Sequence, residues 1–421
     1  MRADPLRGGW VVDHNSRTMV DLEAQPSRTT PADEQALRDA ARALAPQLEA
    51  AADRIEQGRR LPPEIVDALV NQGFYRMLVP RSLGGVEISL PTLADVLEEI
   101  ARADASTAWC LCQAAGTSML AAYLPTPTAR TVFGDPQGIL AWGPGPRASA
   151  RVVEGGYQLS GEWSFASGMH HASWLGASCE LTDAAGAILR GAEGRPQKAM
   201  LVIPFGEAEV LEQWDVNGLL GTGSDGYRVN DLFVPEAYAA RLPLEQPHEP
   251  GPLYLFVGGP SFISAFAVGF GAVALGVAHA TLDAFEELAR TKNPRGLRGV
   301  LREQAIVQAA VGQAEATLRA ARAYLRKTVA EVWEDVSRTG ELTIQQRVQI
   351  RLASSHAIAA GTQVVDTAYH AAGSTAIFRS YPFERRFRDA HAIAQHVQGR
   401  PEHFETAGSY FVGLEPATEW L

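Results

Sequence analysis

Two stretches far apart in this chain carry side chains that could form the two halves of one site. The first, Gly161-Glu-Trp-Ser-Phe-Ala-Ser-Gly168, combines aromatic rings with hydroxyl groups. The second, Arg386-Phe-Arg-Asp-Ala-His-Ala-Ile-Ala-Gln-His396, ends on an imidazole. An imidazole with an unperturbed pKa can accept or donate a proton near neutral pH, which suits His396 to acid or base catalysis. We therefore treat the two stretches as one candidate site.

Both stretches resemble the acyl-CoA dehydrogenase superfamily, in which a flavin ring lies between a β-domain and a helical bundle. The resemblance implies that Phe165 lies against the flavin and that the Ser167 hydroxyl reaches its N5 atom. The dehydrogenases have a catalytic Glu nine residues after the Arg of Arg-Asp-Ala. Counted from Arg388, that position is Val397, which cannot move a proton, and its neighbour is His396. This pattern is similar to the reduced-flavin-dependent monooxygenases, aromatic hydroxylases and relatives, that share the dehydrogenase fold.

The resemblance also implies roles for individual residues. In such monooxygenases reduced flavin reacts with oxygen at C4a to give a hydroperoxide that passes one oxygen atom to the substrate, while the protein binds, orients and shields the cofactor. Ser167 and His396 are then the catalytic candidates. Without the resemblance, the simpler interpretations are a strand or turn serine and a surface histidine. The further flavin contacts expected are Trp163, Phe165 and Ala166, and the expected substrate-pocket residues are Trp109, Trp142 and His171.

Cofactor phosphates need cations or backbone N–H donors. The loop Lys292-Asn-Pro-Arg-Gly-Leu-Arg-Gly299 lies between two expected bundle helices. In the family an Arg from such a loop reaches flavin bound mainly by a neighbouring subunit, which would assign Arg295 or Arg298 to the phosphates. A solvated basic loop is an equally good interpretation. Backbone donors are expected from Gly373, Ser374 and Thr375, and the active unit is expected to be a homo-oligomer, a tetramer.

The elements that must position these residues change character along the chain. Residues 30–136 show helical periodicity, residues 137–251 contain short β-rich runs separated by Gly and Asp, and residues 252–421 turn helical again. Residues 1–29 are polar and are expected to be a disordered or loosely attached extension. This order predicts an α+β protein with an N-terminal helical domain, a central β-barrel or sandwich and a C-terminal four-helix bundle, which is the acyl-CoA dehydrogenase architecture.

Within these blocks we expect particular helices and turns. Thr30 and Pro31 should begin the first helix, and Gly155-Gly156 should form a hairpin turn. Long helices are expected over about 264–291, 301–338 and 343–372, with a last one around 388–397. On such a last helix His391 and His396 would lie about 140° apart, too far around the axis to share one ligand.

Two tempting motifs are declined. Gly221-Thr-Gly-Ser-Asp-Gly226 matches the dinucleotide-binding pattern letter for letter, but the residues after it read as a strand, whereas that fold requires a helix there. His170-His171 invites a metal interpretation, but no carboxylate at suitable spacing completes a site, so we predict no metal. A loop or substrate-pocket role is the preferred interpretation of the two histidines.

Bulk composition excludes several classes of protein. The chain has 421 residues, 46% hydrophobic and 20% charged, which fits a large globular enzyme. Its net charge of -11 argues against a nucleic-acid partner. No uninterrupted apolar run is long enough to cross a bilayer and no signal peptide is visible, so neither a membrane partner nor export is expected. Three cysteines form no disulfide framework, and buried thiols in a cytoplasmic protein are expected.

The sequence therefore predicts the oxygenase component of a two-component flavin monooxygenase, using FMNH2 or FADH2 from a separate flavin reductase. The expected substrate is an aromatic or phenolic small molecule, with oxygenation of N or S as a close variant. Two alternatives stay open: an acyl-CoA dehydrogenase whose base lies elsewhere in the bundle, and a flavin-free assembly protein of the same fold.

Overall fold

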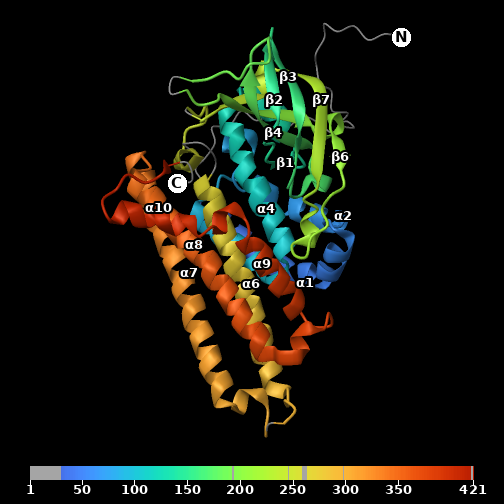
Figure 1. Cartoon of the computed structure of the whole chain (residues 1–421), viewed down its shortest axis with the longest axis vertical. Helices are drawn as coiled ribbons and strands as arrows, with labels where there is room; N and C mark the ends of the chain where they lie inside the picture. The colour runs from blue at the N-terminus through green and yellow to red at the C-terminus, as the bar shows by residue number, and fades with distance from the viewer. Residues whose placement is uncertain (1–29, 192–193, 245, 258–262, 297, 419–420) are drawn as a thin grey trace.

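The computed structural model describes residues 30–421 except 192–193, 245, 258–262, 297 and 419–420, so the predicted extension at 1–29 lies outside the described residues. Helices, then strands, then helices follow one another along the chain, which confirms the α+β class (Figure 1). In Figure 1 the sheet occupies one end of the molecule, and the long C-terminal helices extend away from it. The boundaries expected at 137 and 252 stay a prediction.

The N-terminal block begins where the capping residues place it. Thr30 accepts a hydrogen bond from the Asp33 amide, and the Asp33 carboxylate accepts one from the Thr30 amide, so both ends of a capping box are present. Pro46 lies inside this first helix without ending it. The helices are α1 (Pro31–Gly58), α2 (Pro63–Asn71), α3 (Leu90–Ala103), α4 (Ala105–Ser118) and α5 (Thr126–Phe133). Every residue of α4 is buried, which makes it the central helix of this block.

The central β-domain is confirmed, and among the described residues it consists of one mixed sheet of eight strands. The strand order is β6-β7-β3-β2-β4-β5-β8, and β1 pairs parallel with β4. The predicted hairpin is confirmed, because β2 and β3 pair across Gly155, which has φ +77°. The strands are β1 (Leu140–Gly143), β2 (Ser149–Val153), β3 (Gly156–Trp163), β4 (Trp174–Thr182), β5 (Lys198–Pro204), β6 (Glu209–Leu211), β7 (Gly226–Pro235) and β8 (Ala239–Leu242).

Within the part of the C-terminal block that the structure describes there are three long helices and two short ones. They are α6 (Ile263–Thr291), α7 (Ala305–Thr339), α8 (Ile344–Ala372), α9 (Phe383–Ala394) and α10 (Glu402–Phe411). Against the expectation that no run suits a bilayer, the described residues include one helix, Ser264–Thr291, that is long and apolar enough. Because 94% of its most apolar window is buried inside the protein, this helix forms the core of the bundle.

The end of α9 differs from the expected helix at 388–397. The helix ends at Ala394, and His396 adopts an extended conformation (φ -66°, ψ 151°) that caps a short 3-10 helix, η11 (Val397–Gly399). The helical repeat therefore does not relate His391 to His396, and the expected 140° separation was wrong. The cap has a local cause, because the His396 ring accepts a hydrogen bond from the Gln398 amide.

A loop between β6 and β7 joins the sheet to the helices. A Cβ on Gly218 would lie 2.2 Å from the Arg388 carbonyl oxygen, so only glycine allows the loop to approach α9 this closely. The adjacent Leu219 amide donates a 2.6 Å hydrogen bond to the buried Asp389 carboxyl. Arg388 pairs with Glu56 of α1 and with Glu384, which ties α9 to the N-terminal block. The Arg-Asp-Ala motif thus fixes the position of this loop.

Candidate active site

The loop after β3 holds an exposed aromatic ring in a strained conformation. Phe165 has φ +59° and is 60% exposed. Left-handed backbone is uncommon for a bulky residue and costs on the order of 1 kcal/mol. The flanks keep it in place, because the Ala166 amide donates to the Asp225 carbonyl at 3.1 Å and the Gly168 amide to the Thr222 carbonyl at 2.9 Å. Strain at an exposed ring is typical of a ligand-binding loop.

Ser167 lies behind this ring and is buried in a network of side chains. Its Oγ accepts a hydrogen bond from the Trp109 indole at 3.1 Å. The same Oγ lies 2.7 Å from Ser224 Oγ, and Ser224 Oγ lies 2.6 Å from Thr222 Oγ1. The loop Leu220–Asp225 therefore supplies hydroxyl groups to the position at which the sequence predicts a contact with flavin N5.

His396 reaches the same indole from the bundle. Its ring meets the edge of Trp109 with centroids 5.0 Å apart and an interplanar angle of 89°. Phe270 of α6 packs on both, at 4.6 Å from His396 and 4.1 Å from Trp109. The structure thus brings Ser167 and His396 to one tryptophan, although 229 positions separate their sequence numbers.

His396 does not have the unperturbed pKa assumed from its residue type. Burial, together with the positive charges of Arg351 and Arg400, lowers the pKa of His396 to about 4. The ring is therefore neutral at pH 7. Its Nδ1 accepts from the Gln398 amide at 3.4 Å, which places the ring proton on Nε2. Hence His396 presents a neutral N–H donor rather than a cation.

His391 occupies a different environment. Its Nε2 lies 2.9 Å from a carboxylate oxygen of Asp366 on α8, and its ring packs on Phe387. The two histidines therefore serve separate sites, as predicted, although the reason is the helix end and not the helical repeat.

An aromatic wall continues from Trp109 toward β1. Trp142 donates from Nε1 to the buried Gln113 side chain at 3.1 Å and lies 6.1 Å from Phe266. Phe266 stacks near Phe270 at 6.0 Å, so the rings form one connected apolar surface beside His396. This surface suits the substrate-pocket role expected of Trp109 and Trp142, because it excludes water and presents flat rings.

Two predicted residues lie elsewhere. The Trp163 ring is buried in the core of the sheet, stacks on Tyr227 at 5.0 Å and donates to the Ser178 carbonyl. His171 packs against Tyr75 with centroids 5.7 Å apart, and burial lowers its pKa to about 4. These contacts do not include the ring cluster around His396, although Trp163 also borders a pocket.

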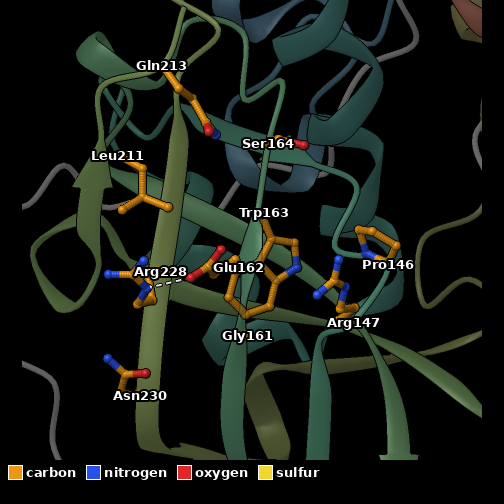
Figure 2. Close-up of a pocket in the computed structure, with 10 residues that line it drawn as sticks. All are labelled: Pro146, Arg147, Gly161, Glu162, Trp163, Ser164, Leu211, Gln213, Arg228 and Asn230. Carbon is orange, nitrogen blue, oxygen red and sulfur yellow. Dashed lines mark hydrogen bonds and ion pairs between the residues drawn. The ribbon is translucent and has the colours of Figure 1, made fainter.

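A pocket of about 550 Å³ opens beside the end of β3, where Trp163 lies (Figure 2). It is bordered by the chain immediately before Phe165, and Figure 2 places Arg147 and Pro146 on one side of Trp163 with Arg228 and Glu162 on the other. Arg228 pairs with Glu162 and Glu209, whereas Arg147 is exposed. The pocket adjoins the Ser167 network but does not contain it.

The expected phosphate contacts lie at the other end of the bundle. Arg295 and Arg298 are exposed in the loop after α6. Lys292 of that loop donates to the Ala372 carbonyl, which brings the loop to the segment Gly373–Ile377. Because α6 rises ~1.5 Å per residue, about 30 Å separates Phe270 from the start of this loop. One subunit therefore does not bring Ser167 and these arginines together.

Several residues with evident roles were not predicted, namely Thr222, Ser224, Asp225 and Asp389. Thr222, Ser224 and Asp225 belong to the glycine-rich motif that was declined as a dinucleotide site, and β7 does follow it as a strand. The Asp225 carboxylate accepts a hydrogen bond from His170 at 2.7 Å, which gives one of the two adjacent histidines a structural role. The sequence signal that could have identified this part of the site is the pair of hydroxyl residues at alternate positions, 222 and 224.

Comparison with known proteins identifies the family of the chain. The family "Acyl-CoA dehydrogenase, N-terminal domain" matches residues 31–125, and "Acyl-CoA dehydrogenase, C-terminal domain" matches residues 268–401. The FADH2-dependent resorcinol hydroxylase oxygenase component of Rhizobium sp. is 28% identical over 88% of this chain and 92% of that protein. The solved structure of XiaF from Streptomyces sp., in complex with FADH2 and glycerol, superposes with a TM-score of 0.84 at 24% identity, over 91% of this chain and 97% of that one.

A further relative decides the family. Indole-3-acetate monooxygenase of Pseudomonas putida is 30% identical over 371 residues, which is 87% of this chain and 91% of that protein. Similarity over nearly the whole length, together with both domain matches, shows that this chain belongs to the acyl-CoA dehydrogenase superfamily and, within it, to the flavin-dependent monooxygenase oxygenase components.

Proposed function

We propose that this protein takes reduced FMN or FAD from a separate flavin reductase and inserts one atom of O2 into an aromatic or phenolic small molecule. Oxygenation at N or S is the close variant. The substrates named for its relatives, indole-3-acetate and resorcinol, are both aromatic, which supports this substrate class. The flat rings of Trp109, Trp142 and Phe270 support it further, because aromatic ligands pack well on such surfaces.

The observation that carries the proposal is the placement of Ser167 and His396 on one indole ring. Ser167 is buried and bonded to the Trp109 indole, His396 packs on the same ring, and the exposed ring of Phe165 lies two residues before Ser167 in the same loop. A planar heterocycle with N–H groups fits this donor and acceptor set. When bound, reduced flavin would supply the oxygen chemistry.

The protein's own residues would then bind, orient and exclude water. We assign Ser167 to the flavin N5–H, Phe165 and Ala166 to the ring, and His396 to a hydrogen bond on the reacting oxygen or the substrate hydroxyl. At the dehydrogenase base position Val397 offers no carboxylate, and its carbonyl accepts from His403 at 2.7 Å. Acyl-CoA oxidation therefore lacks its usual base here.

We further propose that the active unit is a tetramer in the cytoplasm, with Arg295, Arg298 and Gly373–Thr375 of one subunit completing the flavin site of another. The separation along α6 supports this, because these groups are too far from Ser167 in their own subunit. Exposed apolar side chains on the same block supply surface for association, namely Ile377 (64%), Phe378 (57%), Phe411 (62%) and Val412 (75%). The division into domains at 137 and 252 is part of this proposal.

The test is direct. The protein is mixed anaerobically with photoreduced FMN or FAD and a panel of phenols and indoles, and is then exposed to ¹⁸O2. We expect a product that carries one ¹⁸O atom and forms only with reduced flavin. Reduction of bound oxidised flavin by a simple acyl-CoA would favour a dehydrogenase instead. Failure to bind flavin in either redox state would favour a non-catalytic assembly protein.

A further inference from the structure

The hydroxyl groups around Ser167 form a chain that begins at a backbone carbonyl. Leu219 O accepts from Thr222 Oγ1 at 2.8 Å, from the Thr222 amide at 3.1 Å and from the Trp214 indole at 3.2 Å. The Leu219 amide is held by Asp389 at 2.6 Å. Leu219 is therefore held through both its amide and its carbonyl, and the carbonyl oxygen can only accept.

The direction of every later bond follows from this start. A hydroxyl group has one proton and two acceptor lone pairs. Thr222 gives its proton to Leu219 O, so it must accept from Ser224 at 2.6 Å. Ser224 has then used its proton and must accept from Ser167 at 2.7 Å. A reversed chain would bring lone pairs of Thr222 Oγ1 and Leu219 O face to face at 2.8 Å.

Toward any further partner, Ser167 can therefore act only as a hydrogen-bond acceptor. Its proton is given to Ser224, and one lone pair accepts the Trp109 indole N–H, which can only donate. The remaining lone pair is the only hydrogen-bonding capacity of this hydroxyl that these bonds leave unused. Because Ser167, Ser224 and Thr222 are all buried, water does not readily offer the hydroxyls alternative partners.

We propose that Thr222 and Ser224 are positioning residues that make Ser167 an obligate hydrogen-bond acceptor and so select reduced over oxidised flavin. Reduced flavin carries a proton on N5, which this lone pair can accept. Oxidised flavin has a bare lone pair on N5, which would face the serine oxygen without a proton between them. The inference rests on the proposed function, and such a preference would keep oxidised cofactor out of a site that a reductase must supply.

The test compares dissociation constants for the two redox states of one flavin. Reduced FMN or FAD is titrated anaerobically and the oxidised form aerobically, with flavin fluorescence and ultrafiltration as readouts. Ser224→Ala and Thr222→Val free the Ser167 proton to donate. We expect oxidised flavin to bind more tightly to these variants. The dissociation constant of oxidised flavin divided by that of reduced flavin should fall by about three- to tenfold, the effect of one neutral hydrogen bond.

The controls separate orientation from general damage. Thr222→Ser keeps the hydroxyl and should restore the ratio. Thr281→Val removes a buried hydroxyl on α6 that donates to the Val277 carbonyl, and it should leave the ratio unchanged. A purely structural role would weaken both redox states in parallel, whereas the proposal requires the oxidised form to gain affinity.

The outcomes also distinguish this inference from the proposed function. If the unaltered protein binds no reduced flavin, the proposed function fails. If it binds reduced flavin but Ser224→Ala and Thr222→Val both fold and keep the ratio of the unaltered protein, only the assignment of Thr222 and Ser224 fails. Thr222→Val is nearly isosteric, so it remains informative if Ser224→Ala does not fold.

Discussion

The two ends of the C-terminal bundle differ in how complete they are. At the end near the sheet, Ser167, Trp109, Ser224, Phe270 and His396 form a cluster, which we call the Ser167 cluster, with partners from all three blocks of the chain. At the other end the loop 292–299 carries exposed arginines beside Gly373. The groups near the sheet are buried and bonded within one subunit, whereas the arginines of the loop are exposed, and it is there that we propose a contribution from a second subunit.

This difference indicates which end of the bundle should control the reaction and which should control the affinity for the cofactor. The Ser167 cluster has fixed donors and acceptors, so changes there should alter the reaction or the redox preference. The basic loop has charge without enclosure, so changes there should alter only how tightly the cofactor is held. Four predictions test this division, from the largest expected effect to the smallest.

The largest effect is expected at His396. His396→Ala removes the neutral N–H beside Trp109 and should slow product formation by roughly 10²-fold, the low end for a positioned acid or base. Because the pKa of His396 is lowered to about 4, the unaltered enzyme should show no loss of rate from this residue between pH 8 and 5. Steady-state turnover across that range checks both points.

His391→Ala is the matched control, because its ring bonds Asp366 outside the cluster. It should keep turnover within a fewfold of the unaltered protein. The roles of the two histidines would be exchanged if His391→Ala lost turnover while His396→Ala kept it.

The basic loop should control affinity. Changing both Arg295 and Arg298 to Ala should weaken reduced-flavin binding by about tenfold or more, the value of a charge-assisted hydrogen bond, and leave the redox preference unchanged. Arg147→Ala, at the pocket beside Trp163, is the control and should have a smaller effect.

A mixing experiment decides whether the loop acts across subunits. Ser167→Ala protein and the double arginine variant are unfolded together and reassembled as mixed oligomers. Some sites then combine an intact Ser167 with an intact loop, so activity above the sum of the two variants is expected. Simple addition of the two activities would place loop and serine in the same functional subunit.

A smaller effect is expected from Asp389, which holds the loop carrying Leu219. Burial raises the pKa of Asp389 to about 7, with Asp104 adding to the rise and Arg385 and Arg388 opposing it. A carboxyl whose pKa is higher in the folded state stabilises the fold below its unfolded value, near 4, and loses that contribution as pH rises through 7. Asp389→Asn keeps the acceptor for Leu219 and should flatten the dependence of the unfolding midpoint on pH between 4 and 8. An unchanged slope would mean that other groups dominate this range.

The smallest effect concerns strain at Phe165. Asn tolerates positive φ better than Phe, so Phe165→Asn should raise the unfolding free energy by up to about 1 kcal/mol. The same change should weaken flavin binding, because the exposed ring is lost. Thermal unfolding and flavin titration measure the two effects, and a variant that loses both stability and affinity would show that the ring also supports the fold.

Much of the fold could be read from local signals. The capping residues at Thr30 and Asp33 began the first helix as expected, and the hairpin at Gly155 formed where a left-handed turn residue was available. The three long bundle helices were predicted within a few residues, because their apolar periodicity is local to each segment. The last helix was mispredicted, since a side-chain cap from His396 competes with helical hydrogen bonding there.

The residue types at 167, 388, 396 and 397 by themselves determined the superfamily resemblance and the loss of the dehydrogenase base. Only the tertiary structure decided the charge state of His396, the core position of Trp163 and the direction of the hydroxyl chain through Ser224. A sequence records which groups are present. Burial, neighbouring charges and the order of hydrogen bonds depend on contacts that the fold makes between separate segments of the chain, and these determine whether a group is charged and whether it donates or accepts.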